Sequence, residues 1–214
     1  MNQKPWHTAS FYDYNNHFTY TDRPCGKHVT FDPAVGNPPM LYRADVPIGL
    51  AKSMEGKYFV GSAENLRFGN ATNAWARLYN PIDSGVNFFL NVWTATDITS
   101  SPFRIQVWFN TTPPGIIQES DQISPANTAY FPTPIPRVKL EFAVGVMGMP
   151  EGGIKAFCRN EQAGTTINSE EQGKFVFPPG GSFLIFISNP ETPMMPAIAK
   201  ISFGWWEEPI CNAP

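Results

Sequence analysis

The stretch Asn73–Asn110 constrains the fold of this chain more than any other part of the sequence. It contains three segments rich in Val, Ile, Phe, Trp and Thr, residue types that suit a pleated, half-buried surface. These segments are 74–79, 86–96 and 103–109. Turn-forming residues separate them at Asn80–Gly85 and Asp97–Pro102. The stretch therefore predicts three consecutive β-strands.

Alternation within these segments predicts which side chains share a face, because successive side chains of a strand point to opposite sides. In the second segment one face holds Val86, Phe88, Leu90 and Val92. The other face holds Asn87, Phe89, Asn91 and Trp93. In the third segment Trp108 lies opposite the apolar positions. We expect one face of these strands to pack in the core. The second face is polar and aromatic and includes Phe89, Trp93 and Trp108. We expect this second face to be covered rather than fully exposed to solvent.

The rest of the chain repeats this pattern of short apolar segments and turns. The 17 Gly and 22 Pro residues interrupt the chain too often for many long helices. No sustained helical periodicity occurs. Further strands are expected at 57–61, 137–146, 154–159, 174–177, 182–188 and 198–206, with shorter candidates at 128–131 and 165–171. The segment 182–188 is apolar on both faces, as in a central strand. The spacing predicts an all-β fold, a jelly-roll-like antiparallel β-sandwich with an extended N-terminal arm.

We expect three regions: an arm or connector at 1–56, a sandwich domain at 57–209 and a tail at 210–214. The arm has irregular periodicity and many prolines but is dense in aromatic residues, unlike a disordered tail. It is therefore expected to pack on something, either its own sandwich or a neighbouring subunit. The candidate interface aromatics of the arm are Trp6, Phe11, Tyr12 and Tyr14.

The composition argues against two kinds of partner. The net charge is −3 and the pI near 5.6, whereas a nucleic-acid binder normally carries a basic stripe. No apolar run approaches the ~20 residues of a membrane span. The N-terminus also lacks the apolar core of a secretory signal peptide. Only 15% of residues are charged, which suggests that partners cover some of the surface.

The three cysteines have no metal-binding spacing. One interpretation is three unrelated thiols, with Cys158 a small buried residue. The other is that Cys25 and Cys211, both outside the expected core, form intersubunit disulfides. A metal site built from His17, His28 and Cys25 matches no known pattern, and no cofactor is expected.

No catalytic motif occurs, and all three histidines lie in the arm. The adjacent carboxylates Glu170–Glu171 and Glu207–Glu208 would point to opposite faces of a strand, so a solvated surface is the better interpretation. Glu119 and Asp121 are separated by one residue, with no partner or pocket suggested nearby. We expect a protein that is not an enzyme.

Four segments, WARLYNPIDSGVNFFLNVWTATD, SPFRIQVWFNTTPPG, GKFVFPPGGSFLIFISNP and KISFGWWEEP, carry a resemblance. The chain resembles, over Lys57–Pro209, a family of uncharacterised β-sandwich proteins of spore-forming bacteria. In plan it is similar to endospore appendage subunits, which are pilus-like fibre proteins with a jelly-roll domain, an N-terminal connector, no signal peptide and cross-linking cysteines. It departs from them in lacking the adjacent cysteine pair of their connectors.

These observations lead to one preferred function and two alternatives. The preferred one is a structural subunit that self-assembles into an extracellular or spore-surface filament by arm-to-neighbour docking, reaching that location without a signal peptide. Its partners would be itself, and in addition surface polysaccharide or the spore coat. The first alternative is a carbohydrate-binding module that uses Trp93 or Trp108. The second is a phage capsid or tail component.

Overall fold

The computed structural model describes residues 9–12, 17–19, 42–44, 46–99 and 102–210, the first three ranges by their backbone only. The chain divides into two compact units between Ala51 and Lys52. In the first unit, strands β1 (Ala9–Tyr12), β2 (His17–Thr19) and β3 (Tyr42–Ala44) form a small antiparallel sheet in the order β2-β1-β3.

A short helix, α1 (Ile48–Met54), precedes the first strand of the second unit. Seven residues are two turns, too few to give the sustained periodicity that would have revealed the helix in the sequence. Its Lys52 lies in the second unit and forms an ion pair with Glu208, with 2.6 Å between Nζ and Oε1. Burial alone would lower the pKa of Lys52, but the hydrogen bonds with Glu208 and Glu55 outweigh it and raise the pKa.

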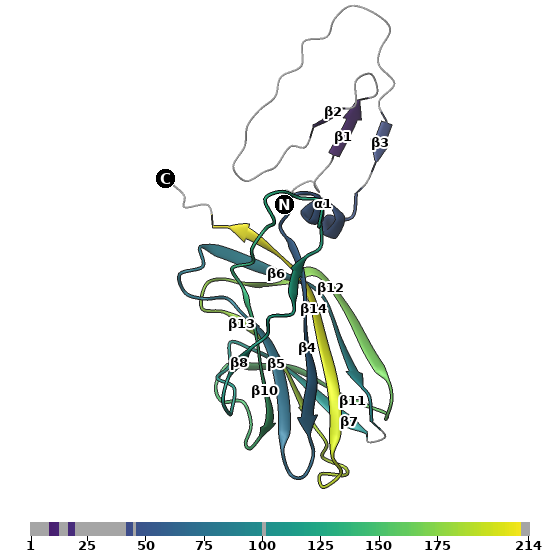
Figure 1. Cartoon of the computed structure of the whole chain (residues 1–214), viewed down its shortest axis with the longest axis vertical. Coiled ribbons are helices and arrows are strands. Elements are labelled where there is room, and N and C mark those ends of the chain that lie inside the picture. Colours follow the sequence, from purple (N-terminus) through teal and green to yellow (C-terminus); the bar gives the residue numbers. More distant parts are fainter. Residues whose placement is uncertain (1–8, 13–16, 20–41, 45, 100–101, 211–214) are drawn as a thin grey trace, which may run out of the picture. The chain divides into compact units, whose positions relative to one another are not determined.

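The second unit is a β-sandwich of two antiparallel sheets (Figure 1). The six-stranded sheet has the order β11-β7-β13-β5-β10-β8. Its strands are β5 (Asn73–Tyr79), β7 (Phe103–Phe109), β8 (Gln118–Glu119), β10 (Lys139–Val146), β11 (Ile154–Glu161) and β13 (Ser182–Ser188). The five-stranded sheet has the order β12-β6-β14-β4-β9. Its strands are β4 (Tyr58–Phe68), β6 (Val86–Asp97), β9 (Ile123–Pro125), β12 (Thr166–Phe177) and β14 (Ala197–Pro209).

The connectivity is that of a jelly roll, which confirms the predicted fold class. Consecutive strands cross repeatedly from one sheet to the other, so that the row β4-β14-β6-β12 faces the row β5-β13-β7-β11. The short strands β8 and β9 extend the two sheets on the side of β10 and β4. The prediction of a central strand at 182–188 is also confirmed, since β13 lies between β7 and β5 and is buried from Ser182 to Ile187.

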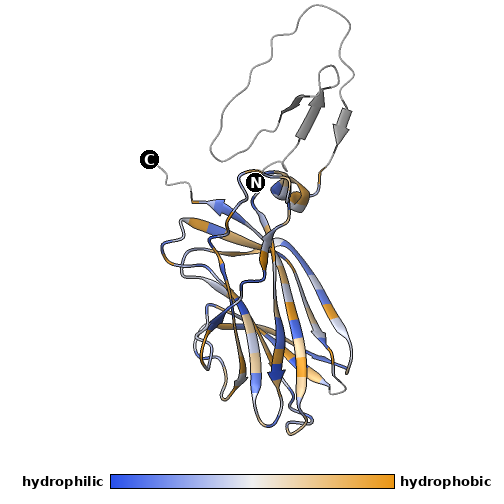
Figure 2. Ribbon diagram, in the orientation of Figure 1, coloured by the Kyte–Doolittle hydropathy of each residue, from blue (hydrophilic) through white to orange (hydrophobic). Residues whose placement is uncertain are grey.

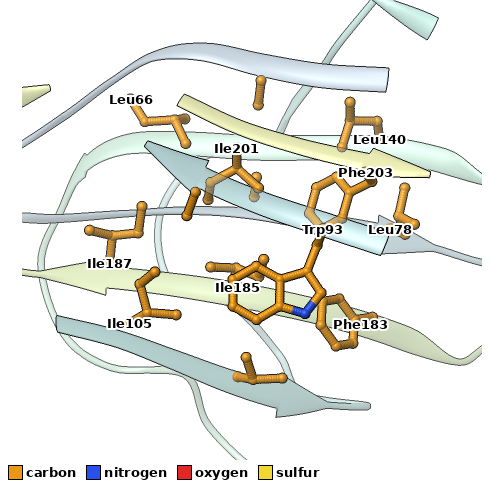
Figure 3. Packing of buried hydrophobic residues seen from close by; sticks show 14 of the residues in the cluster. Leu66, Leu78, Trp93, Ile105, Leu140, Phe183, Ile185, Ile187, Ile201 and Phe203 are labelled. Carbon is orange, nitrogen blue, oxygen red and sulfur yellow. The ribbon is translucent and has the colours of Figure 1, made fainter. Parts of the chain in front are cut away.

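The main core lies between the two sheets. Hydrophobic and hydrophilic residues alternate along the strands, as a sheet with one buried face requires (Figure 2). Trp93 belongs to this core, together with Ile185, Phe183 and Phe203 (Figure 3). Its side chain is fully buried, with 0% exposure.

The burial of Trp93 overturns the predicted face assignment in β6. The register between β6 and β14 shifts so that Leu90 pairs with Trp205 and Val92 pairs with Gly204, which leaves Asn91 as the extra residue of a β-bulge. A bulge reverses the alternation, so Val92 turns outward and Trp93 turns into the core. The prediction that Trp93 shares a face with Phe89 is therefore wrong.

Bulges also explain two other differences from the predicted strands. β4 is eleven residues long, against five predicted, because a register shift at Glu64–Asn65 hides its alternation, with Asn65 at φ 55°. β12 is continuous over Thr166–Phe177, although its interior residues Gln172 and Gly173 have φ of 50° and 76°. The candidate strand at 128–131 is absent, and these residues form turns and bends.

Candidate binding groove on the five-stranded sheet

A groove of about 520 Å³ lies on the outer face of the five-stranded sheet. Strands β4, β14 and β6 form its floor, and residues 121–124 form one wall. Cross-strand pairing arranges the floor in rows. The first row is Val60, Gly204 and Val92, and the second is Ser62, Ser202 and Thr94. The floor thus changes from apolar to hydroxyl-bearing within two residues along the strands.

The hollow at the first row depends on Gly204. A Cβ added there would lie 2.5 Å from Oη of Tyr58 and 2.8 Å from Cγ1 of Val92, so no larger residue fits without movement. Asn91, the bulge residue, donates a hydrogen bond from Nδ2 to the Tyr58 hydroxyl at 2.8 Å. Burial raises the pKa of Tyr58, and the hydrogen bond from Asn91 offsets part of that rise. The hydroxyl is therefore protonated at neutral pH. The bulge that buries Trp93 therefore also fixes one end of the groove.

The wall is held to β4 by hydrogen bonds. The backbone N–H of Ser62 donates to the carbonyl of Gln122 at 3.0 Å, and its hydroxyl donates to Oε1 of Gln122 at 2.9 Å. The hydroxyl of Ser120 donates to the carbonyl of Ser62 at 2.8 Å. These bonds place Asp121 in the lining of the groove. The prediction that Asp121 has no pocket nearby is therefore wrong, while Glu119 is exposed and forms an ion pair with Lys139.

Aromatic and charged rows flank the groove at opposite ends. On the aromatic side, Trp206 pairs across the strands with Tyr58 and Phe89. The rings of Phe89 and Trp206 stack with centroids 5.3 Å apart and an interplanar angle of 5°. Gly173 permits this stack, because a Cβ there would lie 2.0 Å from the Trp206 ring. On the other side, Lys200 forms an ion pair with Glu64 at 2.7 Å.

The three predicted core-domain aromatics do not share one face. Phe89 lies half-buried on the outer face of the five-stranded sheet, and Trp93 lies in the core. Trp108 lies half-buried on the outer face of the six-stranded sheet, because β6 and β7 belong to opposite sheets. Trp93 consequently offers no ring surface to a sugar or to a neighbour.

The outer face of the six-stranded sheet has a small core of its own. Trp108 packs there against a cluster of buried residues, namely Trp75, Ala143, Val146, Leu184 and Phe186. The indole N–H of Trp75 donates to the carbonyl of Pro114 at 2.7 Å, and Thr112 pairs with Glu151 as an isolated bridge. Two loops of the sandwich thus cover this face, and a buried ion pair, Arg77–Glu141, lies on it.

The prediction of solvated surface carboxylates is wrong for Glu171 and Glu207, which are both buried. Glu171 accepts hydrogen bonds from the Trp93 indole and the Ser169 hydroxyl. Burial alone would raise the pKa of Glu171, but the ion pair with Lys174 and these hydrogen bonds lower it. Glu207 accepts bonds from the Trp205 indole and from the backbone N–H of Arg137 and Val138, yet its burial dominates and raises its pKa.

Several sequence-predicted residues lie outside the part of the chain that the structure describes. Cys25, Cys211, Trp6, Tyr14 and His28 are among them. Phe11, Tyr12 and His17 belong to strands β1 and β2, described by their backbone alone. Cys158 is exposed on the edge strand β11, so the interpretation of a buried Cys158 is wrong.

The described residues contain neither a candidate metal cluster nor a candidate membrane-spanning helix. No group of three or more His, Cys, Asp or Glu side chains among them could hold a metal ion. No helix in that part of the chain is both long enough and apolar enough to cross a membrane.

One protein family matches the chain across residues 41–212, which include strands β3 to β14. Its description is "Family of unknown function (DUF6143)". The chain belongs to the DUF6143 family. No curated protein and no solved structure matches the chain. Membership in the DUF6143 family assigns neither an activity nor a source organism to this chain. The similarity in plan to endospore appendage subunits therefore stays a prediction.

Sequence reasoning missed the groove of this DUF6143 protein, although two signals pointed toward it. Gly204 interrupts a strand otherwise rich in large side chains, and such a glycine often marks a bulge or a close approach. Asp121 lies in a polar segment next to a short strand. Neither signal identifies the three strands that form the groove floor. The pairing of those strands depends on how the chain crosses between the two sheets.

Proposed function

We propose that this protein is a non-enzymatic structural subunit that self-assembles, with its N-terminal arm docking on the sandwich of a neighbouring copy. The observation that carries the proposal is the composition of the arm, whose segment 9–20 holds five aromatic residues and a single Asp, Glu, Lys or Arg residue. Aromatic residues are enriched at protein interfaces. The described backbone of the arm forms strands β1, β2 and β3, which pair with one another.

The surface of the sandwich supports the same proposal. It leaves an open, weakly charged groove on one sheet, with Asp121 as the one formally charged residue among those that line it. Head-to-tail docking of an arm on the next copy is a heterologous contact, which generates a ring where the rotation closes and an open filament where it does not. A filament is the form we propose, with Cys25 and Cys211 as the candidate intersubunit disulfides.

The polysaccharide-binding alternative has less support. Of its two candidate tryptophans, Trp93 is fully buried, and Trp108 is half-buried against the small core of the six-stranded sheet. The residues that line the groove present no exposed aromatic ring on which a sugar would stack.

Removal of residues 1–45 tests the proposal. The remaining chain keeps α1 and the whole sandwich core, whose buried residues all lie between Lys52 and Ile210. We expect the full chain to form filaments in negative-stain electron microscopy and the truncated chain to sediment as a folded monomer. Filaments formed by the truncated chain would refute the role of the arm, and a monomeric full chain at all concentrations would refute self-assembly.

The disulfide part of the proposal has its own measurement. Oxidised assemblies should give ladders on non-reducing gels, and these should collapse when Cys25 or Cys211 is changed to Ser. Cys158→Ser is the matched control, because Cys158 is exposed yet lies on the sandwich itself. Ladders that disappear only with Cys158→Ser would contradict the assignment of Cys25 and Cys211.

A further inference from the structure

We propose that the groove on the five-stranded sheet is the acceptor for the aromatic segment 9–20 of a second copy of this chain. This inference rests on the proposed self-assembly and names the two surfaces that meet. The acceptor comprises Val60, Val92, Gly204 and their hydroxyl neighbours on the three inner strands β4, β6 and β14.

The groove floor combines an apolar row with a hydroxyl-bearing row. Val60 is 42% exposed, and with Val92 and Gly204 it forms an apolar row beside the hydroxyl row of Ser62, Ser202 and Thr94. A ligand for such a floor needs an apolar body with a polar tip. Tyrosine has both, because its ring buries a large apolar area and its hydroxyl bonds to polar partners.

The segment 9–20 of the arm is rich in aromatic residues and poor in charged ones. The segment ASFYDYNNHFTY at 9–20 contains five aromatic residues: Phe11, Tyr12, Tyr14, Phe18 and Tyr20. Its one Asp, Glu, Lys or Arg residue is Asp13. The backbone of β1 and β2 pairs Phe11 with Phe18. The residues that line the groove present no exposed aromatic ring, whereas the sequence of this segment is rich in aromatic residues.

The groove and the segment 9–20 both carry few charged side chains. Burial of charges in an interface is costly unless they are paired. The groove contributes Asp121 at its wall, and the nearest charged row on the floor, Lys200 with Glu64, is already an ion pair. Docking of a weakly charged segment onto a weakly charged floor therefore avoids most of the desolvation cost that a charged ligand would incur.

A pair of matched variants in the full chain tests this assignment. Val60→Asp places a carboxylate on the groove floor. Val176→Asp places one on β12 outside the groove lining, where Val176 is 46% exposed and pairs with Phe89 of the same sheet. Thermal unfolding of both variants establishes that each is folded, and sedimentation velocity across a concentration series then measures association.

We expect Val60→Asp to weaken association about tenfold or more, since an unpaired buried carboxylate costs more than the ~1.4 kcal/mol that a factor of ten represents. Val176→Asp should associate as the unaltered chain does. A synthetic peptide of residues 9–20 should bind the chain that lacks residues 1–45, compete with assembly of the full chain and lose its binding to Val60→Asp.

Each contrary outcome has a separate meaning. Equal association of Val60→Asp and the unaltered chain would overturn the groove assignment and leave self-assembly by the arm intact. Equal loss in Val60→Asp and Val176→Asp would also overturn the groove as the specific acceptor. A full chain that is monomeric at every concentration would overturn the proposed function and the groove assignment together.

Discussion

The two outer faces of the sandwich belong to sheets of similar size but differ in what covers them. On the six-stranded sheet, loops lie over Trp75 and its neighbours, and the face has become a second small core. On the five-stranded sheet, the floor of Val60, Gly204 and Val92 stays open as a groove. A sheet covered on both sides is expected to contribute mainly to stability. An open apolar floor has little value for stability, which suggests that its role is binding.

The largest expected effect contrasts single side chains of the two faces. Trp75→Ala should lower the free energy of unfolding by about 3–5 kcal/mol, because it removes a fully buried aromatic side chain and leaves a cavity. Thr94→Ala on the groove floor should cost less than about 1 kcal/mol, because Thr94 is half-buried and at the surface. Urea unfolding followed by fluorescence measures both. Similar costs would mean that the two faces are equally structural.

A smaller effect is expected from the two ion pairs, one on each outer face. Glu141→Gln should cost about 3 kcal/mol, because it leaves Arg77 buried without its carboxylate partner. Glu64→Gln should cost about 0–1 kcal/mol, because Lys200 and Glu64 are both exposed and solvent screens the pair. Unfolding at low and high salt separates them, since only the second pair should respond to salt. A salt-sensitive Arg77–Glu141 pair would show that its loops do not exclude water.

The smallest expected effect is a difference in pH dependence between two buried carboxylates of the five-stranded sheet. The pKa of Glu207 is raised above its ordinary value of 4.5, so its stabilising contribution is complete below that pH and declines as pH rises through the raised pKa. The pKa of Glu171 is lowered, so its contribution is present above pH 4.5 and declines as pH falls through the lowered pKa.

Unfolding free energies of Glu207→Gln and Glu171→Gln, measured from pH 3 to pH 8, test these opposite directions. Relative to the unaltered chain, the stability lost on changing Glu171 should grow with rising pH. The stability lost on changing Glu207 should shrink over the same range. Parallel pH profiles for the two variants would contradict the different environments of the two carboxylates.

The alternation of residues determined much of the fold. The strand at 103–109 was predicted with the bounds that β7 has, and the strand at 182–188 with those of β13. In β7 the apolar positions recur every second residue, whereas β13 is a short run that is apolar on both faces. The sequence alone indicates both strands. The β-sandwich class follows from the same repeated pattern with turns between the strands.

The groove was decided by tertiary structure. Trp93 and Val92 exchange faces because Asn91 bulges, and a bulge depends on the partner strands β12 and β14 rather than on the residues of β6 alone. Phe89 and Trp108 lie on different outer faces because consecutive strands cross between sheets. The sequence by itself determined that this chain forms a β-sandwich with an aromatic arm. Only the pairing of strands distant in sequence decided which side chains meet on each face, because one inserted residue in a strand reverses every side chain that follows it.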